Sequence, residues 1–150
     1  MKSKNMIPVG DVCKENRRRI FVENDCGPFF ISDMEDISER LHTPFEDIFH
    51  DAIFDAAENP EQVWAAVVKA DDIFIDTSFV GSSGELFNKI AKAAIENNIK
   101  GKRIFNLRPY NYIATDIGLD RELFRQIATL NDVYFMTGNY KFFEQIVYNK

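Results

Sequence analysis

The chain has 150 residues, the usual length of one domain, and its 45% hydrophobic content is enough to bury one core. A formal net charge of −6 argues against a broad nucleic-acid-binding face, although an acidic metal pocket would itself contribute to that charge. The two cysteines and two histidines argue against a zinc site with four thiolate or imidazole ligands, and no apolar run approaches the length of a membrane span.

The first half of the chain predicts an arm, a strand and three helices. Residues 1–16 have no clear periodic pattern and predict a flexible arm, whereas the apolar run at 20–22 predicts a short strand. Helices are predicted over 32–41 and 43–56, because each segment opens with Ser or Thr and carries Glu three residues later. A third helix is predicted over 59–68, with Pro at its first helical position.

From residue 72 onward, strands and helices alternate. Short runs rich in Ile, Val and Phe predict strands over 72–77, 103–107 and 133–136. Apolar residues at helical spacing predict helices over 85–99 and, behind an Asp cap, over 120–130. This alternation indicates parallel strands joined by helical crossovers.

The closing segment, residues 140–148, predicts a last helix. Taken together, the elements predict one α/β domain over residues 1–150, with a mostly parallel central sheet flanked by helices in a Rossmann-like three-layer sandwich. Large side chains on the inner side of each element are expected to be mostly buried. These are Phe49, Ile53, Trp64, Phe74, Phe87, Ile90, Phe105, Phe124 and Phe135.

Acidic side chains follow the predicted strands. In an open parallel sheet, ligands bind at the carboxyl ends of the strands. Glu23 and Asp25 follow the first strand, Asp76 lies at the end of the next, and Glu85 and Asp120 stand where two helices begin. Hard oxygen ligands at one edge would suit Mg²⁺ or Mn²⁺.

Each of these residues also has a purely structural interpretation. Asp120 is an ordinary helix N-cap, Glu85 complements a helix dipole, and Asp25 fits plain turn chemistry beside a glycine. The turn at 81–84 could cradle a phosphate through its N–H groups, but it lacks the lysine and the spacing of a P-loop. Both interpretations stay open for each residue.

Three stretches of the chain resemble parts of a PIN-like domain, the fold of many small metal-dependent ribonucleases. IFVENDCGPFF resembles its first strand and acidic end, and IFIDTSFVGSSGELFNKI resembles the strand and helix that supply its second acid. GLDRELFRQIATLNDVYFMTGNYKFFEQI resembles its closing unit, in which an Asp opens a helix and a Thr-x-Asp or Thr-x-Asn turn follows the next strand. The resemblance extends from about residue 19 to the end of the chain.

The resemblance implies a Mg²⁺- or Mn²⁺-dependent ribonuclease, or a degenerate relative of one. Asp25, Glu85 and Asp120 would hold the ion, which would activate a water molecule and stabilise the phosphate transition state. Thr137 and Asn139 would complete the catalytic set by orienting a water or a ligand. Asn139 stands where the family usually carries a carboxylate, and this departure is the reason for including a degenerate relative.

The partners depend on which interpretation holds. In a ribonuclease, Arg108 or Lys141 would contact the RNA backbone. In a non-catalytic interaction or regulatory module, the arginines at 17–19 would contact a protein partner or a second copy of the chain, and in a small-molecule-binding domain the turn at 81–84 would hold the ligand. The sequence shows no secretion signal, so we expect a cytoplasmic protein with reduced thiols.

Overall fold

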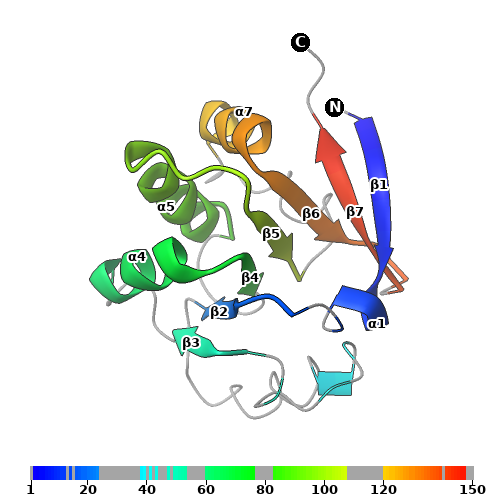
Figure 1. Ribbon diagram of the computed structural model, residues 1–150. Helices are drawn as coiled ribbons and strands as arrows, with labels where there is room; N and C mark the ends of the chain where they lie inside the picture. The colour runs from blue at the N-terminus through cyan, green and yellow to red at the C-terminus, as the bar shows by residue number, and fades with distance from the viewer. Residues whose placement is uncertain are drawn as a thin grey trace.

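The computed structural model describes residues 2–12, 14, 16–23, 38, 39, 41, 43, 47, 49–53, 60–76, 83–107, 120–139 and 141–147. Within these residues, seven strands form one sheet in the order β1-β7-β6-β5-β4-β2-β3 (Figure 1). The strands are β1 (Lys2–Pro8), β2 (Arg19–Glu23), β3 (Asp51–Ile53), β4 (Asp72–Asp76), β5 (Arg103–Asn106), β6 (Asp132–Met136) and β7 (Phe142–Val147).

The centre of the sheet is parallel, and one side of it is antiparallel. Strands β3, β2, β4, β5 and β6 pair in parallel, whereas β7 pairs antiparallel with both β6 and β1. The strands predicted at 20–22, 72–77, 103–107 and 133–136 are therefore confirmed, and the last three are parallel neighbours as expected. Numbered from β2, the parallel strands have the order 2-1-3-4-5, which is the order of flavodoxin-like doubly wound sheets.

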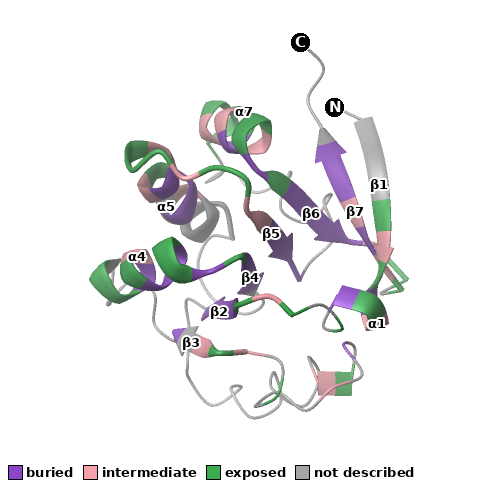
Figure 2. Ribbon diagram, viewed as in Figure 1, coloured by how far each residue is buried: buried purple, intermediate pink, exposed green. Residues whose placement is uncertain are grey.

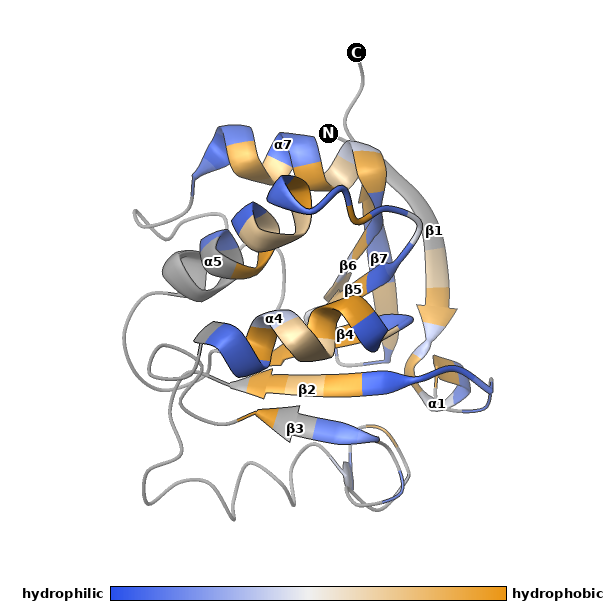
Figure 3. Ribbon diagram, turned by 60° about the vertical axis from the view of Figure 1, so that its left-hand side comes forward, coloured by the Kyte–Doolittle hydropathy of each residue, from blue (hydrophilic) through white to orange (hydrophobic). Residues whose placement is uncertain are grey.

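Three helices lie on one face of the sheet (Figures 1 and 3). They are α4 (Pro60–Lys69), α5 (Ser83–Glu96) and α7 (Arg121–Leu130), and they confirm the helices predicted after Asn59, at 85–99 and behind Asp120. Helix α5 ends near Asn98, which has a positive φ of 59°. No helix among the described residues is long and apolar enough to cross a membrane.

The helix-side core fills the space between the sheet and these helices. Apolar residues alternate along each strand, so that in β4 Ile73 and Ile75 face the helices while Phe74 faces the other way. Figure 2 shows the buried strands inside the more exposed helices. The helix-side core contains Ile20, Val22, Ile73, Ile75, Ile104, Val133 and Phe135 from the strands and Val63, Val67, Ile90, Ala94, Phe124 and Ile127 from the helices.

The opposite core covers the other face of the sheet and is rich in aromatic rings. Phe74 stacks on Phe105 with ring centroids 4.8 Å apart, and Phe105 stacks on Tyr134 at 4.9 Å. Chain segments outside the sheet pack on this face and complete the three layers of the α/β sandwich. The opposite core contains Phe21, Phe74, Phe105, Leu107, Tyr134, Met136 and Phe143 from the sheet and its ends, with Val9 and Val12 of α1 (Val9–Val12) and Leu41.

Most of the predicted core is confirmed. Six of the nine side chains are buried: Ile53, Phe74, Ile90, Phe105, Phe124 and Phe135. Phe49 and Trp64 are half-buried, and Phe49 packs against the rings of Phe21 and Phe74 with centroid distances of 5.2 Å to each. The side chain of Phe87 lies outside the described residues.

The closing helix predicted at 140–148 is wrong, because Phe142–Val147 forms strand β7. A tight turn at Gly138 and Asn139 folds the chain back on β6, and the Thr137 N–H closes it by donating to the Phe142 carbonyl at 2.9 Å. A short loop that contains Gly between two apolar runs is a known hairpin signal. The spacing of the aromatic residues in 140–148 is compatible with both a helix and a strand. The turn before this segment favours the strand, because it places the segment beside β6.

Two further expectations from the first half of the chain are wrong. Within the helix predicted at 43–56, Asp51–Ile53 instead forms strand β3, parallel to β2. The His50 imidazole Nδ1 accepts from the Arg19 N–H at 3.0 Å, and the His50 N–H donates to the Arg19 carbonyl at 2.8 Å, which ties this segment to β2. Within the expected flexible arm, Lys2–Pro8 forms strand β1 because β7 offers it a pairing edge.

A polar network holds the amino ends of the parallel strands together. Asp72, at the start of β4, is fully buried. Its carboxylate accepts two hydrogen bonds from Arg103 at 2.8 and 2.7 Å and one from Arg17 Nε at 2.8 Å. Because a buried carboxylate is costly unless it is paired, these arginines have a structural role at this edge.

Candidate functional site

The sheet has a topological switch point between β2 and β4. The chain leaves the carboxyl end of β2 for β3 on one side, whereas it leaves the carboxyl end of the neighbouring strand β4 for β5 on the other side. Connections that diverge in this way leave a crevice at the carboxyl ends of the two strands, which is the usual ligand site of doubly wound sheets. This carboxyl edge is therefore the candidate site.

Two acidic residues are neighbours at the switch point. Glu23, the last residue of β2, is opposite Asp76, the last residue of β4, in the parallel register. Like charges at directly opposed positions of neighbouring strands destabilise a sheet. The register describes the backbone positions of Glu23 and Asp76, and their side chains lie outside what is described. Sequence analysis placed both residues at strand ends, but it did not foresee their pairing.

The first turns of α5 and α7 meet at the same edge. The Asp120 backbone N–H donates to the Asn88 side-chain carbonyl at 2.9 Å. Glu85 precedes Asn88 by three residues on α5, so the two positions lie on the same side of that helix. The bond places Asp120 beside the helix that carries Glu85, whereas the Glu85 side chain lies outside what is described.

Asp120 also has the structural role that its sequence context predicts. One of its carboxylate oxygens accepts from the backbone N–H groups of Glu122 at 3.0 Å and Leu123 at 3.1 Å. The side chain is exposed, and these bonds cap α7. Capping occupies Oδ1, so any ligand at Asp120 would bind through Oδ2 or share Oδ1.

Asn106 is a further candidate at the carboxyl edge, and the sequence did not single it out. It ends β5, is fully buried, and lies between Ile75 and Phe135 in register, both of which belong to the helix-side core. Its Nδ2 donates to the Tyr134 carbonyl at 3.0 Å, but no described group donates to its Oδ1. An unsatisfied buried carbonyl oxygen costs about 1–3 kcal/mol, so a ligand that donates to it or coordinates it would recover this energy. The signal was a single amide in the apolar run RIFNL.

Thr137, Asn139 and Lys141 lie in the turn after β6. The Thr137 hydroxyl donates to Asn139 Oδ1 at 2.7 Å, and the same oxygen accepts from the Lys141 backbone N–H at 3.1 Å. These bonds shape the β6–β7 hairpin. The turn is at the carboxyl edge, but β5 and β4 separate it from β2, so the structure does not bring it to the switch point.

The expected metal set is only partly described. Asp25 and Arg108 lie outside the described residues. Within the described part of the chain, no group of three or more His, Cys, Asp or Glu side chains is arranged to hold a metal ion. The donors at the carboxyl edge are nevertheless of a suitable kind, since carboxylates and the orphaned Asn106 oxygen are hard ligands of the type that Mg²⁺ and Mn²⁺ prefer.

Comparison with protein-family models finds no match, and neither the curated proteins nor the solved structures contain a significant one.

Proposed function

We propose that the carboxyl edge binds Mg²⁺ or Mn²⁺ and hydrolyses a phosphate ester, as a PIN-like metal-dependent ribonuclease or a degenerate relative of one would. The observation that carries the proposal is the register of β2 and β4, which makes Glu23 and Asp76 neighbours at the switch point. A divalent cation would offset the repulsion between two such carboxylates.

The chain's own groups supply the rest of the site. Glu85 adds an acidic residue in the first turn of α5, and Asp120 adds one as the N-cap of α7. The N-terminus of α5 favours an anionic phosphate nearby. Asn106 offers an oxygen that lacks a donor among the described residues. When bound, the ion would lower the pKa of a water molecule and stabilise negative charge on the phosphate.

Among the described residues, the distribution of basic side chains favours a short substrate. Arg17, Arg18 and Arg103 lie at the amino edge, away from the proposed site, and are paired with Asp72 or Asp51. Binding a long nucleic acid usually requires many phosphate contacts from Lys and Arg. We therefore propose a mononucleotide or a short oligonucleotide as the substrate.

A non-catalytic interaction module is the second candidate. It is favoured by the bonds of Asp120, which cap α7, and by the bond between Thr137 and Asn139, which shapes a hairpin. Each of these residues then has a complete structural role without chemistry.

Thermal melts with increasing MnCl₂ test the first proposal. We expect the wild-type Tm to rise with metal concentration by mass action, and Asp76→Asn and Asp120→Asn to reduce or abolish the rise. Asp120→Asn is informative because Asn is as good an N-cap as Asp, so the substitution removes the charge and keeps the cap. Glu96→Gln, an exposed substitution at the other end of α5, is the matched control and should retain the full rise.

A cleavage assay with a short oligoribonucleotide complements the melts. Metal-dependent cleavage by the wild type that is lost in Asp76→Asn would support hydrolysis. A wild-type Tm that does not respond to Mn²⁺, together with no metal-dependent cleavage, would leave the interaction module as the better proposal.

A further inference from the structure

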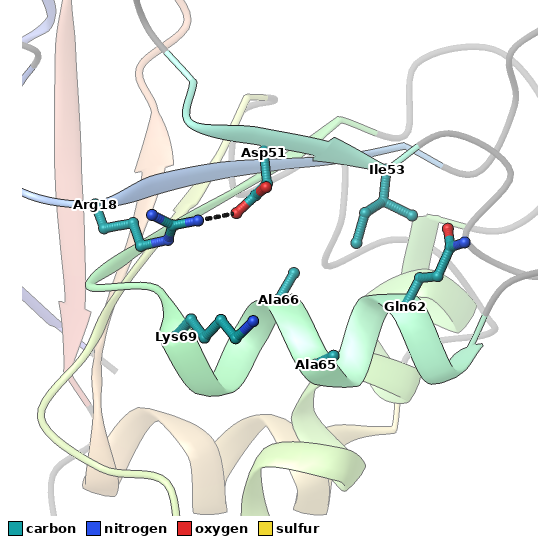
Figure 4. Close-up of a pocket in the computed structure, with 7 residues that line it drawn as sticks. All are labelled: Arg18, Asp51, Ile53, Gln62, Ala65, Ala66 and Lys69. Carbon is teal, nitrogen blue, oxygen red and sulfur yellow. Dashed lines mark hydrogen bonds and ion pairs between the residues drawn. The ribbon is translucent and has the colours of Figure 1, made fainter.

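A pocket lies between α4 and strands β2 and β3 (Figure 4). It has a volume of about 310 Å³ and extends along the length of β3, from Asp51 to Ile53. This volume is at the lower end of the range for small-molecule sites, so it suits a small ligand. Ile53, Ala65 and Ala66 form an apolar wall, and Arg18, Asp51, Gln62 and Lys69 add polar groups.

Three charged side chains line the part of the pocket near the amino ends of β2 and β3 (Figure 4). Arg18 Nη2 is 2.6 Å from Asp51 Oδ2, and this ion pair is partly exposed. The Lys69 side chain starts from the last turn of α4 and extends along that helix in the direction of Ala66 (Figure 4). Two cations and one anion leave one net positive charge.

Lys69 is not needed to cap its own helix. Lys102 Nζ donates to the Ala70 carbonyl and, at 3.3 Å, to the Val68 carbonyl, so it satisfies oxygens at the carboxyl end of α4. Among the described residues, Lys69 itself has no hydrogen bond or ion pair with a side chain. Its ammonium group is therefore available to a ligand.

We infer that this pocket binds a small monocarboxylate with a short branched aliphatic chain. The carboxylate would pair with Lys69 and share the Arg18 guanidinium with Asp51, while the aliphatic part would pack on Ile53 and Ala66. Asp51 neutralises one of the two cations, so the net charge matches a monoanion better than a phosphate dianion. The apolar wall favours an alkyl carboxylate over a bare inorganic anion.

Calorimetric titration with isovalerate tests this inference. We expect saturable binding by the wild type, weakened at least about ten-fold by Lys69→Met because a charge-assisted hydrogen bond is lost. Lys92→Met, which removes an exposed lysine on α5, is the matched control and should bind as the wild type does. Asp51→Asn should tighten binding, because it releases Arg18 to the ligand.

Two further probes separate charge from shape. Isopentylamine has the same carbon skeleton with the opposite charge and should not bind, and inorganic phosphate should compete weakly. The inference fails if isovalerate does not saturate the wild type, if Lys69→Met binds it equally well, or if phosphate binds more tightly than isovalerate. Thermal melts of each variant show whether a loss of binding comes from unfolding. Lys69→Met should have the same Tm as the wild type, because Lys69 is exposed.

Discussion

Glu122, in the first turn of α7, is held by its helix neighbours. Its carboxylate accepts from Arg125 at 3.1 and 2.5 Å and from Gln126 at 3.2 Å. The hydrogen bonds from Arg125, followed by that from Gln126, lower the pKa of Glu122 from its ordinary value of 4.5 to about 2. Between these two values the unfolded chain binds more protons than the folded chain, so the contribution of Glu122 to stability is lost as the pH falls.

We expect Glu122→Gln to lower the Tm slightly at about pH 6, and this difference from wild type to shrink as the pH falls below 4.5 toward about 2. The effect should be small because the side chain is exposed. Thermal melts of both proteins across this range provide the measurement, with Glu96→Gln as an exposed control. A difference in Tm that stays constant with pH would show that the carboxylate is not stabilised by these bonds.

At the scale of single residues, the sequence predicted roles that depend on near neighbours. The capping role of Asp120 could be predicted because the N–H groups it binds are only two and three residues away. The Asn106 oxygen that lacks a described donor could not be predicted from the sequence. Its surroundings come from β4 and β6, which are neighbours of β5 only in the folded sheet. The pairing of Glu23 with Asp76 is non-local in the same way.

At the scale of elements, strand β7 is the clearest departure from the sequence-based prediction. Its side chains alternate, so that Phe143 is fully buried while Phe142 is only half-buried. The Phe143 ring contacts those of Phe105, with centroids 4.9 Å apart, and Phe74, at 6.3 Å. This alternation predicts that truncating Phe143 and truncating Phe142 to Ala lower the free energy of unfolding by very different amounts.

We expect Phe143→Ala to lower the free energy of unfolding by about 3–5 kcal/mol, because it leaves a cavity in the opposite core. Phe142→Ala, one residue away and of identical chemistry, should cost clearly less. Urea denaturation followed by fluorescence measures both values. Equal costs for the two substitutions would contradict the alternation and favour another conformation of this segment.

The elements predicted correctly are those with strong local signals. Strands β4, β5 and β6 are continuous apolar runs, and α5 and α7 carry long apolar stripes, so pattern alone identifies them. Strand β3 has only three residues, which is too short for its period to be distinguished from that of a helix. Strand β1 forms because it pairs with β7, which lies near the other end of the chain. A local sequence pattern cannot reveal a pairing between residues so far apart in the sequence.

At the scale of the whole molecule, the two edges of the parallel sheet have different chemistry. The amino edge holds acids and arginines in paired contacts, with Asp72 fully buried between Arg17 and Arg103. The carboxyl edge instead places Glu23 beside Asp76 and leaves the Asn106 oxygen without a described donor. The described acidic groups at the amino edge are paired, whereas at the carboxyl edge two acidic positions are neighbours and one buried amide oxygen lacks a described donor. We therefore assign a structural role to the Asp72 network and propose metal binding at the carboxyl edge.

This division predicts that Asp72→Asn destabilises the fold without impairing the response to metal. The substitution removes the carboxylate charge that Arg103 and Arg17 contact, and the side chains of these arginines are 12% and 32% exposed. We expect a loss of about 3 kcal/mol in the free energy of unfolding, at the low end for buried ion pairs because Arg17 reaches water. Urea denaturation provides the measurement.

Asp51→Asn is the matched control for this change. It breaks the pair between Asp51 and Arg18 at the same edge, but both side chains are about two-fifths exposed, at 40% and 42%. Its cost should stay below about 1 kcal/mol. If the edges are independent, Asp72→Asn at a temperature where it stays folded should still bind Mn²⁺ with the wild-type dissociation constant. Weaker Mn²⁺ binding by the folded variant would instead mean that the amino-edge network positions the carboxyl ends of β2 and β4. Such an effect would be transmitted along β4, because Asp72 is the first residue and Asp76 the last residue of this five-residue strand.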